Sequence, residues 1–204
     1  MQYLFSLSLG YLLGCSSMAY YIGCWKKKDI RTAGTGNLGA SNATVLFGWG
    51  AGVAVAVHDI AKAFVAVWLA GLLFPQVVHA GAAAGVACVY GHIFPFYLKF
   101  KGGKGLASYF GLVLALNWKL AVLVAIVMVA ITVISDFISL AAIVAVVVVP
   151  VCVYLIYHDL YLTLIVCAAS VLMLYKHREN IVRIANGQEI GLRSTAKGEK
   201  RIDK

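Results

Sequence analysis

The sequence predicts an all-α polytopic membrane protein with about seven transmembrane helices and glycine-rich, re-entrant or interfacial loops on the cytoplasmic side. Hydrophobic residues make up 62% of the chain and charged residues only 12%. Soluble domains have roughly 45–50% apolar residues and about 25% charged residues. Seven apolar stretches follow one another, and most basic residues gather in three clusters beside them. This composition excludes a soluble globular domain, a disordered chain, a disulfide-stapled secreted domain and a collagen-like fibre.

The apolar stretches are the predicted helices, because a helix needs about 20 apolar residues to cross the hydrocarbon core. The first stretch is interpreted as a helix rather than a cleaved signal peptide, since it is long enough to span. The fourth and fifth would be only about 17–23 Å long, so they must extend through their flanks or begin in a protein-lined cavity. The stretches cover residues 3–25, 50–74, 77–98, 106–116, 120–134, 137–157 and 161–175.

The basic clusters, near residues 26–31, 99–104 and 176–204, predict the topology. Lys and Arg collect in cytoplasmic loops, and seven spans place all three clusters on that side with the N-terminus outside. Five spans do the same if two stretches merge or re-enter. We expect one integral-membrane domain over residues 1–190 and a polar basic cytoplasmic tail over residues 191–204. No nucleic-acid motif accompanies the charge.

Two glycine-rich segments are candidates for phosphate binding. Residues 34–39 match G-x-G-x-x-G, but the dinucleotide fingerprint needs a βαβ unit. We therefore expect a re-entrant or interfacial loop that leads into a short helix, with amides open to an anion. Residues 99–105 hold three lysines and three glycines before an apolar stretch. Exposed amides, ammonium groups and a helix N-terminus favour phosphate there, and the alternative is a tight cytoplasmic turn.

His177 and Asn180 lie i, i+3 where the last apolar stretch ends, so they share one helix face. That face can present a base and an amide, or be an ordinary interfacial helix end. Asp59 and Lys62 lie inside an apolar stretch, where each charge costs about 2.5–3.5 kcal/mol. We expect them to form a structural ion pair shared with the glycine-rich loop, the alternative being a direct substrate role, and His58 to point elsewhere.

His92 lies beside the second glycine-rich segment, and it is either a buried structural donor or part of the site. The five cysteines are expected to be small buried hydrophobes rather than redox or metal ligands. No metal site is predicted.

Together these segments resemble one family, the bacterial acyl-phosphate:glycerol-3-phosphate acyltransferases known as PlsY. Each motif alone is weak, but all occur in the family's order and spacing, from the first apolar stretch to about Gln188. The matching pieces are Gly10-Tyr11-Leu12-Leu13-Gly14, residues 34–42, Asp59-x-x-Lys62, Gly91-His92-x-Phe94-Pro95, Phe100-Lys101-Gly102-Gly103-Lys104-Gly105 and His177-Arg178-Glu179-Asn180-Ile181-x-Arg183.

The resemblance implies a seven-helix fold with a cytoplasmic-side active site in the bacterial plasma membrane. It implies transfer of a fatty acyl group from acyl phosphate to the 1-hydroxyl of glycerol 3-phosphate, the first step of phospholipid biosynthesis. The products are lysophosphatidic acid and phosphate, and no metal or organic cofactor is used. The expected partners are the two substrates and the lipid bilayer, with no nucleic acid and no protein partner readable from the sequence.

Acyl phosphate is already activated, so the protein needs mainly to position the hydroxyl and to stabilise oxyanion charge. We assign Lys104 to phosphate and oxyanion stabilisation, and His177 with Asn180 to orienting the acceptor. The base is left among His177, His92 and a substrate phosphate oxygen. The other site residues are Thr35, Gly36, Asn37, Gly39, Ser41, Asn42, Lys101, Gly102 and Gly103 for substrate binding, with Asp59, Lys62 and His92 as structural support.

The chain departs from the family's usual pattern at three positions. Thr35 stands for Ser and Ser41 for Thr, which keeps a hydroxyl at each. Val45 stands for an Arg of the phosphate-binding set, and valine cannot provide the bidentate guanidinium fork. Either another cation replaces it, or glycerol 3-phosphate binds more weakly, or the acceptor differs. The replacement candidates are Arg31, Lys28 and Arg178.

Two further functions compete with the acyltransferase. An anion or phospholipid transporter would use the glycine loops as a conduit, as transporters use broken helices, but no inverted repeat is visible. A non-catalytic scaffold or regulator is supported only by Val45.

Overall fold

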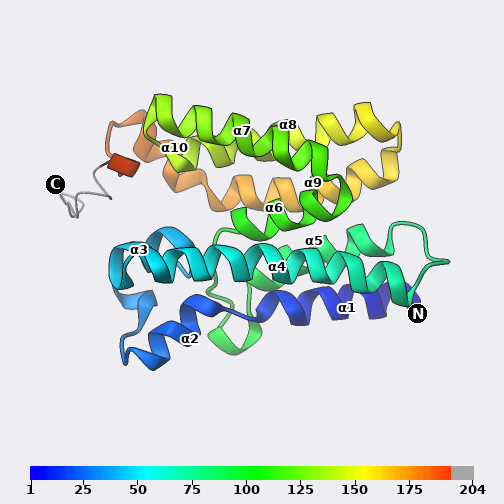
Figure 1. The fold of residues 1–204 in the computed structure, drawn as a ribbon, viewed down its shortest axis with the longest axis horizontal. Coiled ribbons are helices and arrows are strands. Elements are labelled where there is room, and N and C mark those ends of the chain that lie inside the picture. Colours follow the sequence, from blue (N-terminus) through cyan, green and yellow to red (C-terminus); the bar gives the residue numbers. More distant parts are fainter. Residues whose placement is uncertain (194–204) are drawn as a thin grey trace. The chain divides into compact units, whose positions relative to one another are not determined.

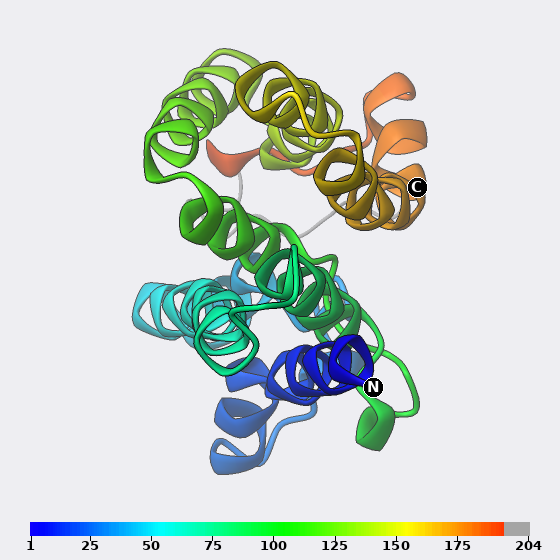
Figure 2. The ribbon, with the colours of Figure 1, turned by 90° about the vertical axis from the view of Figure 1, so that its right-hand side faces the viewer.

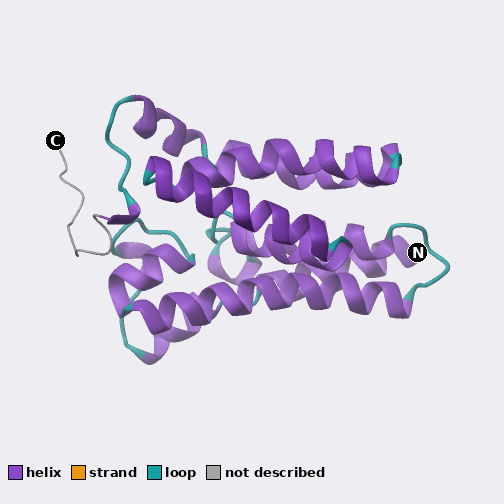
Figure 3. Cartoon of the chain, turned by 45° about the horizontal axis from the view of Figure 1, so that its top comes forward, coloured by secondary structure: helices purple, strands orange, loops and turns teal. Residues whose placement is uncertain are grey.

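A computed structural model describes residues 1–193, and these contain helices and loops but no strand (Figure 3). The chain forms two compact units, one over Met1–Trp118 and one that begins at Lys119, and each is described by itself. The first contains α1 (Gln2–Cys15), α2 (Met18–Trp25), the 3-10 helix η1 (Ile30–Thr32), α3 (Ala40–Phe47), α4 (Trp49–Leu73), α5 (Ala80–Ile93), the 3-10 helix η2 (Phe96–Leu98) and α6 (Leu106–Leu116) (Figure 1). The second contains α7 (Trp118–Ser135), which starts at the boundary, α8 (Ile138–Tyr157), α9 (Leu160–Lys176) and α10 (Arg178–Ala185).

Small residues allow the helices of the first unit to pack closely. Figure 2 views α1, α4 and α5 nearly end-on, and these three helices contact one another. Gly10 and Gly14 of α1 lie against the backbone of Ala84 and Cys88 of α5, where a Cβ on either glycine would overlap that backbone. Small residues at this four-residue spacing let membrane helices approach closely. The pair Gly10 and Gly14 therefore fixes where α1 crosses α5.

The first apolar stretch forms two helices, so the single helix expected over residues 3–25 was wrong. The break falls at Ser16 and Ser17, between α1 and α2. Ser16 is extended (φ −60°, ψ 130°), and the Ser17 hydroxyl caps α2 by accepting a hydrogen bond of 3.3 Å from Tyr20 N. Serine favours helix starts over helix interiors because its hydroxyl competes for backbone hydrogen bonds.

Within the described residues, four helical segments are long and apolar enough to cross a membrane, and a fifth qualifies if α9 and α10, bent by 48°, form one span. The expected extension of the fifth apolar stretch is confirmed, since α7 has 18 residues. By contrast, α1 has only 14 residues and α6 only 11. The number of about seven spans is therefore not confirmed. The four are Trp49–Leu73, Ala80–Leu98, Trp118–Ser135 and Ile138–Tyr157.

In the second unit, α8 and α9 pack against each other. Their buried side chains include Val149 and Val153 of α8 and Val166 and Met173 of α9. Burial of such apolar side chains contributes packing contacts along the whole helix pair. Helix α9 ends at His177, where the chain bends into α10.

The start of the expected tail is bound to the turn between α7 and α8. Leu192 N donates to Asp136 O at 2.7 Å, and Arg193 N donates to Asp136 Oδ1 at 2.9 Å. Residues 194–204 of the predicted tail lie outside the described residues. The division into one membrane domain over residues 1–190 and a tail stays a prediction.

Candidate active site

The side chain of Asn42 holds the glycine loop, defined here as residues 33–39. Asn42 lies in the first turn of α3 and is only 1% exposed. Its Oδ1 accepts a hydrogen bond of 3.0 Å from Thr35 N. Its Nδ2 donates at 3.1, 3.2 and 3.0 Å to the backbone oxygens of Ile30, Ala33 and Asn37. The structure thus gives Asn42 a loop-holding position, although the sequence suggested substrate contact.

The glycine loop leads into the short helix α3, as expected from the sequence. Gly34 and Gly36 have φ of 61° and 67°, the left-handed region that glycine enters without a Cβ penalty. Thr35 and Ser41 are exposed, and α3 begins after Gly39 without a side-chain cap hydrogen bond. The N-terminus of a helix attracts anions through its amides and dipole. This start of α3, with two exposed hydroxyls beside it, suits a phosphate group.

The lysine loop, defined here as residues 99–105, folds back onto the end of α5. Gly102 N donates to Ile93 O at 3.0 Å, and Gly103 N donates to His92 O at 3.1 Å. A Cβ on Gly102 would overlap the His92 carbonyl, and a Cβ on Gly103 would overlap the His92 ring. Both amides are therefore engaged within the fold rather than exposed, and substrate binding by these glycines stays a prediction.

Two lysines of this loop lie just before α6. Lys101 is exposed and Lys104 is partly buried. Gly105 has φ 93°, and α6 starts after it without a side-chain cap hydrogen bond. Ammonium groups beside a helix N-terminus create a local positive potential that favours an anion. The geometry is compatible with the phosphate role predicted for Lys104.

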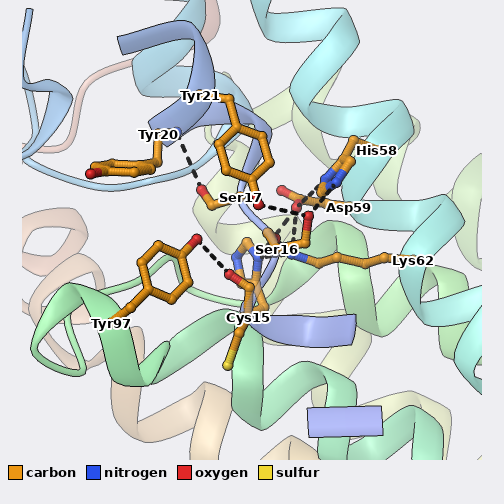
Figure 4. Close-up of polar contacts among 10 residues, drawn as sticks. Cys15, Ser16, Ser17, Tyr20, Tyr21, His58, Asp59, Lys62 and Tyr97 are labelled. Atoms are coloured by element: carbon orange, nitrogen blue, oxygen red, sulfur yellow. Dashed lines mark hydrogen bonds and ion pairs between the residues drawn. The ribbon is translucent and has the colours of Figure 1, made fainter. Parts of the chain in front are cut away.

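A buried polar cluster joins α1, α4 and α5 (Figure 4). Lys62 Nζ lies 2.7 Å from Asp59 Oδ1, so the ion pair expected from their i, i+3 spacing is present. The same Nζ donates to Ser16 O at 2.7 Å and lies 2.9 Å from His92 Nδ1. All three ionisable side chains are buried. The charges are thus paired inside the unit, as buried charges must be.

His58 belongs to the same cluster, so the expectation that it points elsewhere was wrong. Its Nε2 lies 3.0 Å from Ser16 Oγ, and its Nδ1 lies 3.5 Å from Asp59 Oδ1. Tyr97 Oη donates to Cys15 O at 2.9 Å, which satisfies a carbonyl at the end of α1 (Figure 4). The helix break at Ser16 brings these groups together. The signal in the sequence was the serine pair itself, inside an otherwise apolar stretch.

In the second unit, the backbone fixes the ring of His177. His177 is 4% exposed, and its Nδ1 lies 2.8 Å from Met173 O. A carbonyl only accepts hydrogen bonds, so Nδ1 carries the proton. In the neutral ring Nε2 is then the nitrogen with the lone pair. Nε2 is therefore the nitrogen of the neutral ring that can accept a proton.

Sequence reasoning missed Glu189, which holds the other expected catalytic residue of this unit. Asn180 is buried, and its Nδ2 donates to Glu189 Oε1 at 2.6 Å. Arg183 Nε donates to Glu189 Oε2 at 2.7 Å, and Ser139 Oγ donates to Oε1 at 2.8 Å. Hydrogen bonds to an ionised carboxylate are strong, so Glu189 fixes the orientation of the Asn180 amide. Glu189 lies in the loop after α10, outside the motif of residues 177–183.

Val45 lies on α3 and is 54% exposed. Among the candidate replacement cations, Arg31 donates through Nη2 to Asp29 Oδ2 at 2.8 Å and through Nε to Oδ1 at 3.0 Å. These hydrogen bonds hold the pKa of the Asp29 carboxyl below its usual range. Arg178 lies over the Tyr175 ring, 4.1 Å from its centroid. Both guanidinium groups thus already have partners.

The two loops of the first unit share one buried apolar cluster. Leu38 of the glycine loop and Leu98, which directly precedes the lysine loop, both belong to it, together with Ile30 and Val55. His92 links the lysine loop to the buried ion pair through its backbone and its ring. The first unit therefore brings together both glycine-rich segments and the ion pair, whereas His177 and Asn180 belong to the second unit.

Comparisons with known proteins agree over nearly the whole chain. The profile of a family described as glycerol-3-phosphate acyltransferase matches residues 4–187. A glycerol-3-phosphate acyltransferase of Lactiplantibacillus plantarum is 34% identical over 190 residues, which cover 93% of this chain and 91% of that protein. One from Staphylococcus aureus is 38% identical over 202 residues, with 93% and 97% covered.

Two crystal structures of PlsY, an integral membrane glycerol 3-phosphate acyltransferase, have a similar fold. The glycerol 3-phosphate form has a TM-score of 0.90 and 30% identity, and covers 97% of this chain and 98% of that chain. The lysophosphatidic acid form has a TM-score of 0.85 and 31% identity, with 94% and 95% covered. The family resemblance, the all-α integral-membrane class and the acyltransferase class expected from the sequence are confirmed. The chain belongs to the glycerol-3-phosphate acyltransferase family.

Proposed function

We propose that the protein transfers a fatty acyl group from acyl phosphate to the 1-hydroxyl of glycerol 3-phosphate. The products are lysophosphatidic acid and phosphate, and the reaction is the first step of phospholipid biosynthesis in a bacterial plasma membrane. One observation carries the acceptor assignment. The similar PlsY structures are a glycerol 3-phosphate form and a lysophosphatidic acid form, and these two molecules differ by one acyl group. Acyl phosphate as donor is supported by the sequence resemblance.

The proposed reaction needs no covalent enzyme intermediate. The 1-hydroxyl oxygen attacks the acyl carbon, the bond from that carbon to the phosphate oxygen breaks, and phosphate leaves. The hydroxyl proton passes to His177 Nε2 or to a substrate phosphate oxygen. The Nδ1–H to Met173 O contact leaves Nε2 as the basic nitrogen, which supports His177 in this role.

Phosphate recognition is assigned to the first unit. Both substrates carry phosphate, and both glycine-rich loops precede a helix without a side-chain cap. We assign the hydroxyls of Thr35 and Ser41 to one phosphate, and Lys101 with Lys104 to the other and to developing oxyanion charge. The apolar cluster that contains Leu38 and Leu98 supports two neighbouring sites.

The topology proposed is that predicted by the basic clusters. The N-terminus lies outside, and both loops and the C-terminus face the cytoplasm. Acyl phosphate and glycerol 3-phosphate would then be taken from the cytoplasmic side, with the acyl chain in the bilayer.

A variant of this function has a different acceptor. It is favoured by one observation, the exposed Val45 on α3 where the family usually has Arg. Losing a charged hydrogen-bonding partner costs about 1.5–3 kcal/mol, or roughly tenfold to more than a hundredfold in affinity. An acceptor with less phosphate charge would lose less affinity from the absence of the guanidinium.

The test is an assay of the purified protein in lipid vesicles with palmitoyl phosphate and glycerol 3-phosphate. Lysophosphatidic acid and phosphate are measured for the parent, Lys104→Ala and Val45→Arg. We expect product from the parent, its loss in Lys104→Ala, and a lower KM for glycerol 3-phosphate in Val45→Arg. Product only from Val45→Arg would favour a different acceptor. No product from any folded sample would overturn the proposal.

A further inference from the structure

The ammonium group of Lys62 has a complete set of partners. An ammonium carries three N–H donors and no acceptor. Its three neighbours are Ser16 O and Asp59 Oδ1, both at 2.7 Å, and His92 Nδ1 at 2.9 Å. They come from the end of α1, from α4 and from α5. One side chain thus ties three helices at one point.

This arrangement fixes the tautomer of His92. Lys62 can only donate, so His92 Nδ1 must accept and its proton must lie on Nε2. The alternative, in which Nδ1–H donates to Asp59 Oδ1, has the longer separation of 3.3 Å. It would also bring two donors, Nδ1–H and the ammonium, within 2.9 Å of each other. His92 is therefore the Nε2–H form.

The opposite edge of the His92 ring lies against the lysine loop. A Cβ on Gly103 would overlap His92 Nε2, so this nitrogen lies directly beside the loop backbone. The backbone of the lysine loop is also hydrogen-bonded to His92, because Gly103 N donates to His92 O at 3.1 Å. Any rotation of the ring therefore moves, or is blocked by, the loop that carries Lys104.

We propose that Lys62 is a positioning residue of the acyltransferase. Its ammonium holds His92 in the Nε2–H form, and His92 in turn holds the lysine loop in the conformation that binds a substrate phosphate. Asp59 supplies the counter-charge that keeps the ammonium in place. This inference rests on the proposed function, and it assigns a supporting side chain that does not itself touch substrate.

The role differs from simple stabilisation in what it does to kinetics. When Lys62 no longer holds His92, the lysine loop spends only a fraction of its time in the conformation that binds phosphate. The apparent dissociation constant of the phosphate ligand then rises by the inverse of that fraction, while bound substrate still reacts. A purely structural role would lower the amount of active protein, and hence kcat, at unchanged KM.

The test uses the double variant Asp59→Leu/Lys62→Met, which removes both charges and so leaves neither one buried alone. Lys26→Met is the matched control, because Lys26 is an exposed lysine that does not belong to the cluster of Asp59, Lys62 and His92. The measurements are the thermal midpoint, kcat, and the KM for palmitoyl phosphate and for glycerol 3-phosphate. We expect a folded double variant in which one of the two KM values rises about tenfold and kcat changes less than about threefold, with no change in Lys26→Met.

Two readouts are independent of catalysis. Nitrogen-15 NMR of the His92 ring should show Nε2–H in the parent and lose that fixed tautomer in the double variant. Titration with inorganic phosphate should show an affinity about tenfold weaker in the double variant. A folded double variant with both KM values and the phosphate affinity of the parent would overturn the inference, as would an Nδ1–H ring in the parent. A parent that binds phosphate and keeps the Nε2–H ring but makes no product would instead overturn the proposed function.

Discussion

The glycine loop and the lysine loop resemble each other in sequence, but they are held in different ways. One side chain, the amide of Asn42, bonds four backbone groups of and around the glycine loop. The lysine loop is held by its own amides on the carbonyls of α5 and by the close fit of Gly103 on the His92 ring. Thus the first loop depends on one polar side chain, and the second depends on the absence of side chains.

The largest effect is expected at the hub of the glycine loop. Asn42→Ala leaves one amide and three carbonyls without their partner, and a buried unsatisfied group costs about 1–3 kcal/mol. We expect a loss of stability of about 2–4 kcal/mol and a collapse of activity. The measurement is the thermal unfolding midpoint in detergent together with the vesicle assay.

The control for Asn42→Ala is its neighbour Ser41→Ala, because Ser41 is exposed on the same helix turn. The free energy of unfolding of Ser41→Ala should lie within about 0.5 kcal/mol of that of the parent. Equal stability of the two variants would contradict the view that one side chain holds this loop.

In the lysine loop the sensitive positions should be glycines. Gly102→Ala pushes a methyl group into the His92 carbonyl, which is backbone and cannot turn aside. Gly103→Ala meets the His92 ring, which can shift only by leaving Lys62. Overpacking of this kind costs about 1–3 kcal/mol, so we expect activity to fall about tenfold or more, with Gly102→Ala the worse.

The control for the glycine variants is Gly50→Ala in α4, where a Cβ would have no neighbour within 4 Å. It should retain parental activity in the vesicle assay. Parental activity in both Gly102→Ala and Gly103→Ala would mean that the lysine loop does not lie against α5 in the active enzyme.

A smaller effect is expected in the second unit, where a carboxylate takes the part that Asn42 takes in the first. Glu189→Gln weakens the hydrogen bonds from Asn180 and Arg183, which are charge-assisted in the parent. We expect a stability loss of about 1.5–3 kcal/mol and reduced kcat, because the Asn180 amide loses its fixed orientation. Glu179→Gln, at a side chain 67% exposed, is the matched control and should behave as the parent in both measurements.

The smallest effect is expected at the exposed pair of Asp29 and Arg31, beside the glycine loop. The pKa of Asp29 is lowered by Arg31 from its usual 3.8. A carboxyl with a depressed folded pKa stabilises above its unfolded pKa, and this is lost as the pH falls through the folded pKa. Asp29→Asn should therefore be slightly less stable than the parent at pH 7, and the two thermal midpoints should converge in acid below about pH 4. A difference between the two thermal midpoints that grows as the pH falls would contradict a stabilising ion pair between Asp29 and Arg31.

Much of the fold followed from local sequence signals. Apolar stretches of helical length gave the helices, because the bilayer requires about 20 apolar residues per span. The Asp59–Lys62 pair followed from i, i+3 spacing, since two charges inside an apolar helix need each other. The loop before α3 followed from its glycines and polar residues.

The parts that could not be predicted depend on contacts between distant segments. The break at Ser16 is stabilised by Lys62 and Tyr97, which bond the carbonyls of Ser16 and Cys15 from other elements. A hydropathy pattern contains no such information, so one long helix was expected there. Glu189 was missed although Asn180 lies only nine residues before it, because the turn after α10 that brings the two together has no local sequence signal. Its third partner, Ser139, lies 50 residues away.

The proposed reaction moves an acyl group from acyl phosphate to glycerol 3-phosphate. The most direct test is the stoichiometry of the parent protein in vesicles, with palmitoyl phosphate as the only acyl source. We expect one lysophosphatidic acid for each phosphate released, and no phosphate release above background when glycerol 3-phosphate is omitted. Phosphate release without lysophosphatidic acid, or neither product from a folded sample, would contradict it.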